Sequence, residues 1–347
     1  MSLDQRIKLA RDRAGYSLRA LAERAGVSHN AIAKYERGED IPSSGVLLAL
    51  ADALGVQLDY FFREHTATLQ QVRFRKASRC GLGEQRRAEG EALEYLERYR
   101  QVEAILGDPL PFDRPDIAWR VTSLADVERV AEELRAAWAL GLDPLENLAS
   151  VLEDKGVRVC LVEGCDGFDG LAAWLEDGLP VIAVRRAIPG DRQRFDLAHE
   201  LGHLLLELPP EWDEKQGEKA AHRFAGAFLA PAPAVRAELG GRRSDLETRE
   251  LYLLKHKYGL SMQAWARRAR DLEVISQAAY EGICRRFSRN GWRKEEPGDQ
   301  ALPETPRRME QLVYRALAED KISRARAAEL LGEKTGALEP ETELVAA

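Results

Sequence analysis

The feature that most constrains this 347-residue chain is the pentapeptide His199-Glu200-Leu201-Gly202-His203. Histidines four residues apart lie on one face of an α-helix, so this spacing predicts a helix on which both imidazoles bind one metal ion. The surrounding residues, from Asp191 to Leu208, are apolar at helical spacing, as such a site requires. Glu200, beside the first ligand, is placed to act as a general base on a water molecule. Gly202 is expected to leave space beside the ion.

A third ligand is expected on the helix that follows. A catalytic zinc site usually has three protein ligands and one position open to water. Glu218 and His222 lie on an expected helix from about Lys215 to Leu229 and, being four apart, share one face. Spacing does not choose between them: His222 has the higher intrinsic affinity for zinc, whereas Glu218 completes the common set of two histidines and one glutamate.

The residues before the pentapeptide change to a strand-like pattern. The segments 157–162, 170–175 and 179–184 are each short, apolar and bounded by turn residues, so they are interpreted as three strands. An extended substrate peptide could pair with the middle strand by β-augmentation. Trp174 on this strand is either a substrate contact or an ordinary half-buried aromatic residue.

Residues 1–64 show five short helical segments, and the central pair forms a helix-turn-helix pattern. Ser17 and Ser28 stand where helix N-caps belong, and Gly26 supplies the backbone angles that the turn needs. This region, with its Glu36-Arg37-Gly38 sequence and its closing Leu54-Gly55-Val56, resembles the Cro/CI-type repressor family. The resemblance implies that the second helix of the pair enters the major groove of a double-stranded DNA operator.

The same resemblance implies which side chains face the DNA. They are Ser28, His29, Asn30 and Lys34. Residues 1–64 hold nine Lys or Arg and nine Asp or Glu, so the domain is not basic overall, and a homodimer is expected to strengthen DNA binding. A helical scaffold that mediates only dimerisation or protein contacts is the alternative.

The region around the pentapeptide resembles the ImmA/IrrE family of metallopeptidases, from about Ala118 to Arg293. The resemblance rests on residues 194–203, on Glu218 and on the segment 224–231. It implies that Glu218 is the third ligand of Zn²⁺, with Mn²⁺ as a second candidate metal, and that His222 acts behind the ligands or on the substrate. Family members often carry Thr where Asp196 stands, and Asp196 is expected either to cap the helix or to hydrogen-bond a ligand.

The resemblance also implies a function. Family members cleave repressors, often of the Cro/CI type, in stress, DNA-damage or mobile-element responses. We therefore expect a DNA-binding regulator with a zinc-dependent endopeptidase domain that cleaves a repressor or itself. The alternative is a transcriptional regulator, or the antitoxin partner of a toxin, whose zinc domain senses a signal without proteolysis. Complete ligands together with Glu200 favour the enzyme, because sensing needs no general base.

The expected fold is α+β and mainly helical. A helix-turn-helix domain (1–64) leads through a helical connector (65–115) into a zincin-like peptidase domain with a three-stranded sheet (116–240). A helical region that itself resembles a helix-turn-helix (241–293) precedes a last helical unit with a disordered tail (294–347). Six arginines of the helical region could contact single-stranded nucleic acid; they are Arg267, Arg268, Arg270, Arg285, Arg286 and Arg289.

The composition adds two expectations about the compartment. No run approaches the ~20 apolar residues of a membrane span, and the N-terminus does not read as a signal peptide, so a cytoplasmic protein is expected. Four cysteines without a CxxC pair are expected to be free thiols; they are Cys80, Cys160, Cys165 and Cys284.

Overall fold

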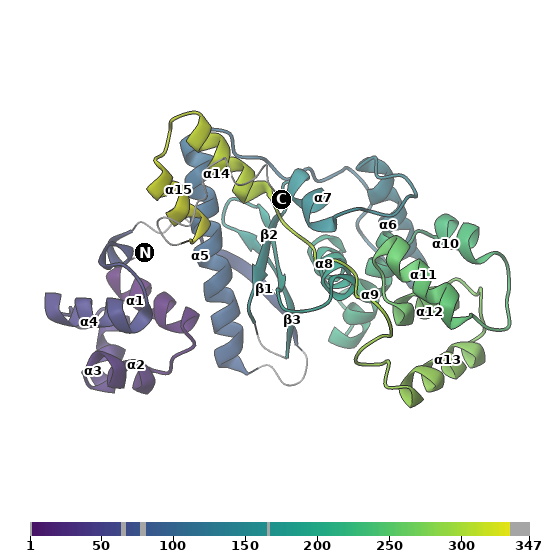
Figure 1. The fold of residues 1–347 in the computed structure, drawn as a ribbon, viewed down its shortest axis with the longest axis horizontal. Helices are drawn as coiled ribbons and strands as arrows, with labels where there is room; N and C mark the ends of the chain where they lie inside the picture. Colours follow the sequence, from purple (N-terminus) through teal and green to yellow (C-terminus); the bar gives the residue numbers. More distant parts are fainter. Residues whose placement is uncertain (1, 64–66, 77–80, 165–166, 334–347) are drawn as a thin grey trace.

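A computed structural model describes residues 2–63, 67–76, 81–164 and 167–333 of the chain. Cys80, Cys165 and the expected disordered tail from residue 334 onward lie outside the described residues. The described residues form fifteen α-helices and one four-stranded sheet, which confirms the mainly helical α+β class. Figure 1 shows the N-terminal helices on one side of the long helix α5 (Leu82–Leu106), the sheet with most of the remaining helices on the other, and the last two described helices at the upper end of α5. No helix within the described residues is long and apolar enough to span a bilayer.

The N-terminal helices form a small unit with its own core. Their bounds are Leu3–Arg13 (α1), Leu18–Ala25 (α2), His29–Glu36 (α3), Ser44–Leu54 (α4) and a 3-10 helix, Leu58–Phe62. The hydroxyl oxygens of Ser17 and Ser28 accept backbone N–H groups of Ala20 and Ala31, both at 3.1 Å, so both expected N-caps are present. Gly26, with φ of 68°, ends α2 in the left-handed conformation that the turn demands.

The sheet has four strands where the sequence predicts three. Their bounds are Leu69–Lys76 (β1), Arg158–Val162 (β2), Phe168–Leu175 (β3) and Pro180–Arg185 (β4), in the order β1-β3-β4-β2. β2 and β4 are parallel, whereas β3 runs antiparallel to both of its neighbours. The extra strand, β1, lies in the segment expected to be a helical connector, and that expectation is wrong there. β1 pairs with a strand that lies far along the chain, so the pairing cannot be predicted from neighbouring residues. Its basic residues also resemble a charged, solvent-exposed segment.

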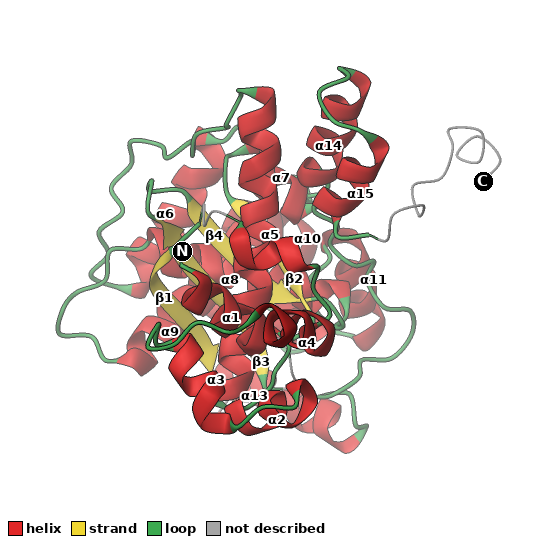
Figure 2. Ribbon diagram, turned by 90° about the vertical axis from the view of Figure 1, so that its left-hand side faces the viewer, coloured by secondary structure: helices red, strands yellow, loops and turns green. Residues whose placement is uncertain are grey.

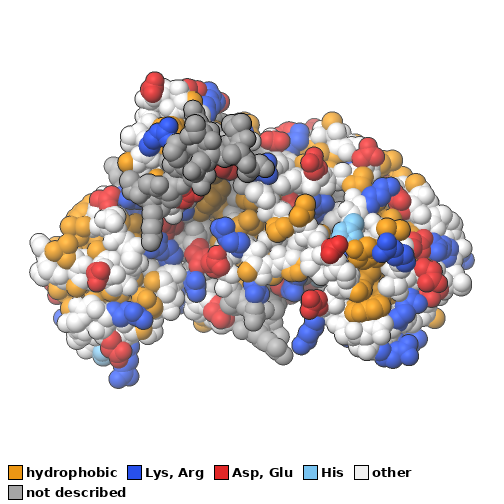
Figure 3. Space-filling model, viewed as in Figure 1, with side chains coloured by type: hydrophobic (Ala, Val, Ile, Leu, Met, Phe, Trp, Pro, Cys, Tyr) orange, Lys and Arg blue, Asp and Glu red, His pale blue; other side chains and the backbone are white. Residues whose placement is uncertain are grey.

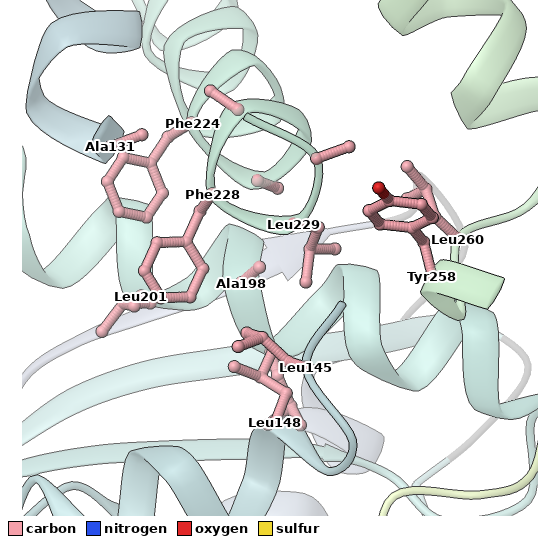
Figure 4. Close-up of a cluster of buried hydrophobic side chains, with 14 of the residues drawn as sticks. Ala131, Leu145, Leu148, Ala198, Leu201, Phe224, Phe228, Leu229, Tyr258 and Leu260 are labelled. Carbon is pink, nitrogen blue, oxygen red and sulfur yellow. The ribbon is translucent and has the colours of Figure 1, made fainter. Parts of the chain in front are cut away.

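Helices cover both faces of the sheet. Alternate side chains of β2, β3 and β4 pack against α5, whereas Val159, Ile182 and Val184 point to the other face and join the main core. That core lies around α6 (Leu124–Ala137), α7 (Leu148–Asp154), α8 (Gly190–Leu205) and α9 (Glu214–Leu229). Figure 4 shows part of it, with Phe224 and Phe228 of α9 above Ala198 and Leu201 of α8.

The C-terminal third is helical, as expected. α10 (Ala232–Leu239), α11 (Thr248–Tyr258), α12 (Met262–Asp271) and α13 (Gln277–Arg289) extend the main core. α14 (Arg308–Ala318) and α15 (Arg324–Leu331) instead return to the far half of α5 and pack there (Figures 1 and 2). The last two described helices therefore pack on α5, the helix that separates the N-terminal unit from the sheet.

The N-terminal unit is fixed to α5 through α1. Leu9 packs against the apolar face of α5, and Arg6 Nη1 donates to a carboxylate oxygen of Glu97 at 2.5 Å in a buried ion pair. Gly90 allows this approach, since a Cβ there would lie 3.1 Å from the backbone nitrogen of Arg13. α2 and α3 lie at the lower end of the unit in Figure 1.

Candidate metal centre

Two neighbouring helices, α8 and α9, carry the residues that the sequence singles out. Phe224 and Phe228 of α9 stack with ring centroids 5.7 Å apart in the core against α8. A Cβ on Gly202 would lie 3.0 Å from the Phe224 ring, so the glycine permits the close packing of the two helices. The expectation that Gly202 leaves space beside a metal ion is therefore corrected: Phe224 fills that space.

The structure brings His199, His203 and Glu218 together. The two histidine Nε2 atoms are 3.0 Å apart, and the carboxylate oxygens of Glu218 lie 3.4 Å from His199 Nε2 and 3.1 Å from His203 Nε2. Within the described chain these residues form the one group of His, Cys, Asp and Glu side chains with metal-ligand spacing. Ligands at about 2.0–2.1 Å from a tetrahedral zinc ion are separated from one another by about 3.3 Å. The donor triangle therefore fits zinc.

The three side chains differ in exposure, which shows the open side of the triangle. His199 is fully buried, His203 is 11% exposed and Glu218 is 36% exposed. Hydrogen bonding to His199, and then to His203, holds the pKa of Glu218 below its usual value. Glu218 is therefore an ionised carboxylate at the solvent-facing corner of the donor triangle.

Glu200, the residue after His199 on α8, lies against β3 of the sheet. It is fully buried, and a Cβ on Gly170 of β3 would lie 2.8 Å from its Oε1 atom. Any larger residue at position 170 would displace the carboxylate. The sequence pattern of this strand predicts no role for Gly170, although a glycine inside a strand often marks such a close approach. Arg192 ties the same part of β3 to α8, because its Nη2 donates to Asp169 at 2.6 Å.

His222 packs behind the donor triangle of His199, His203 and Glu218 and is not part of it. Its ring lies 4.6 Å from that of His199 and 5.5 Å from that of Phe195, measured between centroids. Phe195, Asp196 and His222 line a cavity of about 640 Å³ that extends towards α12 and α13. Asp196 is buried inside α8, which begins at Gly190, so it does not cap that helix.

A second cavity, of about 440 Å³, opens at the exposed side of the donor triangle. His203 and Glu218 form part of its wall, together with Asp213 and Glu214 of the loop and helix that precede Glu218. Val72 and Arg73 of β1 form another part. Trp174 is not among its lining residues; it is half-buried, and its ring packs edge-to-face on Phe112 with centroids 6.1 Å apart.

The side chains expected to face DNA are all exposed on the outer side of the N-terminal unit. They are Ser28, His29, Asn30 and Lys34. α3 is held from behind by Ile32, which is fully buried, and by an ion pair at 2.6 Å between Glu36 and Arg11 of α1. Helical spacing does not reveal this ion pair, because its two residues belong to different helices. The exposed edge of α3 is therefore presented by a rigid scaffold.

The six arginines of the helical region do not form one free basic cluster. Arg268 is buried and pairs with Glu128 of α6, Arg270 pairs with Asp271, and Arg286 lies 3.1 Å from Asp245. Arg285 lies 3.8 Å from Glu281, so four of the six arginines are paired with acids, and the expectation of one basic cluster is wrong. On the face shown in Figure 3, acidic and basic side chains are interspersed.

Comparison with known proteins gives two domain matches. Residues 7–61 match a helix-turn-helix family, and residues 153–270 match the IrrE N-terminal-like domain family. The HTH-type transcriptional regulator ImmR of Bacillus subtilis strain 168 is 38% identical over 60 residues, which are 17% of this chain and 47% of that protein. An uncharacterized transcriptional regulator in the ATPase CF(0) region of Rhodospirillum rubrum is 42% identical over 60 residues, 17% of this chain and 56% of that protein. The chain thus spans about half the length of these curated relatives.

Proposed function

Because this chain joins an XRE-type helix-turn-helix domain to an IrrE/ImmA-like domain, we propose that it is a DNA-bound regulator with zinc-dependent endopeptidase activity. The observation that carries the proposal is the donor triangle of His199, His203 and Glu218 with a buried glutamate, Glu200, on the same helix. A site that only binds a metal has no need of that glutamate.

In the DNA-binding part, α3 enters the major groove of an operator. Asn30, near the start of the helix, is placed to read a base edge, whereas Lys34 and the hydroxyl of Ser28 are placed to contact phosphates. The exposed positions of these side chains support this assignment. Two copies bound to neighbouring half-sites would compensate for the modest charge of one domain, so we expect a homodimer on DNA.

In the peptidase part, His199, His203 and Glu218 would hold the metal. Bound Zn²⁺, or Mn²⁺, supplies Lewis-acid polarisation of a water molecule and of the scissile carbonyl group. Glu200 accepts the proton of the attacking water and passes it to the leaving amine. Gly170 positions that carboxylate by letting it lie against the backbone of β3. His222, packed on His199, keeps the imidazole of the buried ligand in place.

The substrate that agrees with this architecture is a protein segment held near DNA. A repressor of the same helix-turn-helix type is one candidate, and the chain itself is the other. Cleavage would relieve repression during a stress, DNA-damage or mobile-element response. The alternative is a regulator or antitoxin that binds a signal without proteolysis. The cavity of about 640 Å³ beside His222 favours this alternative, because a small ligand bound there would contact the back of the metal centre.

Glu200→Gln tests the proposal. Purified wild type, Glu200→Gln and Glu211→Gln are incubated with Zn²⁺ or Mn²⁺ and candidate repressors; Glu211 is an exposed residue outside both cavities and serves as the matched control. We expect cleavage by wild type and control, and a loss of about 10²- to 10⁴-fold in Glu200→Gln with metal content unchanged. If no protein is cleaved while metal and DNA are bound, the regulator without proteolysis is the correct reading.

A further inference from the structure

The strand β1 lies at the edge where a peptide would bind. One edge of β3 is hydrogen-bonded to β4. The other edge pairs antiparallel with β1. The family match covers residues 153–270, so β1 is not part of the matched domain. Without β1, β3 would present a free edge above Glu200, ready to add an extended segment by β-augmentation.

The register brings β1 next to the general base. Arg75 is paired with Gly170, the residue whose backbone lies against the Glu200 carboxylate. Two residues earlier, Arg73 is paired with Ala172 and lines the cavity that His203 and Glu218 also line. A segment of the chain itself therefore runs, in extended form, past the general base and the open side of the donor triangle.

The pairing of β1 with β3 is irregular near the cavity. The register shifts between Gln70 and Arg73, so one extra residue of β1 bulges out of the ladder. Gln71 in this bulge has φ of 52°, a left-handed conformation that disfavours a side chain of this kind. Among the described strands, β1 is also an edge strand, paired with β3 alone. Displacing it breaks one row of hydrogen bonds and leaves the other three strands paired.

Charge complementarity indicates what the cavity accepts. β1 carries three basic residues, Arg73, Arg75 and Lys76, and no acidic one. The cavity is lined by Asp213, Glu214 and Glu218, with Arg73 as the basic member of its wall. A basic side chain at this position of a bound peptide would therefore be attracted electrostatically, and an acidic one repelled.

We propose that β1 is a displaceable internal peptide that occupies the substrate edge of β3. The site admits another segment only when residues 69–76 leave, and that segment is extended with a basic residue at the position of Arg73. The inference rests on the proposed function, because it takes the β3 edge as the place where a substrate binds. Under this proposal, β1, which lies between the two domains in the sequence, controls access to the metal centre.

The test measures binding rather than cleavage. A fluorescent peptide with the sequence of residues 69–76 is titrated by anisotropy into zinc-loaded, full-length Glu200→Gln protein, alone or with Arg73→Glu, Arg73→Pro or Arg242→Glu. Arg73→Glu places like charge in the acidic cavity, and Arg73→Pro introduces into β1 a residue that has no N–H group to donate. Both weaken the internal strand, so we expect at least tenfold tighter peptide binding than in Glu200→Gln alone. Arg242, exposed after α10, should have no effect when replaced.

Two further measurements complete the test. A second peptide, with Glu at the position of Arg73, should bind at least tenfold more weakly than the first. Amide hydrogen exchange in β3 should stay slow when the first peptide replaces β1. Equal peptide affinity in all four proteins, or equal affinity for both peptides, would overturn the proposal.

These outcomes are separate from those that decide proteolysis. If wild-type protein cleaves no substrate but the binding pattern holds, the proposed activity fails and the displaceable strand stands. If wild type and Arg73→Glu bind and cleave an external peptide equally well, the activity stands and the displaceable strand fails.

Discussion

The helix-turn-helix unit and the metal centre place their functional side chains in opposite ways. Asn30 and Lys34 are exposed on a surface helix, whereas His199 and Glu200 are fully buried. The surface helix depends on short-range features such as the Ser28 cap and the Gly26 turn. The metal centre needs two helices and a strand to meet. A surface that reads DNA can therefore be built locally, but a buried set of metal-binding side chains requires the packing of a whole domain.

If this contrast is correct, the metal centre can be destroyed without harming DNA binding. Glu218→Ala removes the carboxylate at the exposed corner of the triangle, and we expect about a 1000-fold loss of zinc affinity. Even groups behind a metal ligand are worth about 10- to 100-fold, and a ligand itself is worth more. His222→Ala, which removes a neighbouring ring outside the triangle, should cost at most about 100-fold. Competition with a zinc chelator measures both variants.

DNA affinity is the control for this comparison. Both variants should bind an operator as wild type does, because the helix-turn-helix unit has a separate core. Parallel loss of zinc and of DNA binding in Glu218→Ala would show that the two regions are one functional unit. Equal loss of zinc in the two variants would instead remove Glu218 from the ligand set.

The contrast also explains how far the sequence could be interpreted. The caps, Gly26 and the His199–His203 pair follow from spacings of three or four residues, and the structure has each where it was expected. β1 could not be recognised, because its partner β3 lies beyond three helices in the sequence and its own residues look like a solvated charged run. Arg268 was misjudged for the same reason, since Glu128, which neutralises it, lies on α6.

The largest effect on stability is expected where the two regions meet. Arg6→Met leaves Glu97 buried without its ion-pair partner and should lower the free energy of unfolding by about 3 to 5 kcal/mol. Arg6→Met combined with Glu97→Met removes both charges and should recover most of that loss. Urea denaturation of full-length protein measures both variants. A single variant as stable as wild type would mean that the two regions are held together by other contacts.

A smaller and pH-dependent effect is expected in the larger region. Burial raises the pKa of Glu153 to about 7, although the N–H groups of Arg308 and Arg307 oppose this rise. The folded chain therefore keeps a proton that the unfolded chain releases above its ordinary pKa of 4.5. Wild type should lose stability as the pH rises from about 4.5 to about 7, whereas Glu153→Gln has no proton to lose there.

The measurable quantity is the difference between the two proteins. Relative to wild type, Glu153→Gln should gain about 2 to 3 kcal/mol between pH 4.5 and pH 8, most of it below pH 7. Urea denaturation of both proteins across this pH range gives this difference, in which the contributions of all other titrating groups cancel. A constant difference would show that Glu153 is ionised throughout.

The smallest effects are expected on the DNA-binding surface, where each contact is exposed to water. Lys34→Ala should weaken binding about tenfold on every sequence and reduce the slope of log affinity against log salt by about one, since it removes one phosphate contact. Asn30→Ala should cost a similar factor only on the cognate operator and leave the salt slope unchanged, because a base contact carries specificity. Fluorescence anisotropy at several salt concentrations separates the two. If both variants changed only the salt slope, α3 would lie on the phosphate backbone and another element would have to read the bases. If neither variant changed DNA binding, the N-terminal unit would serve protein contacts instead of DNA.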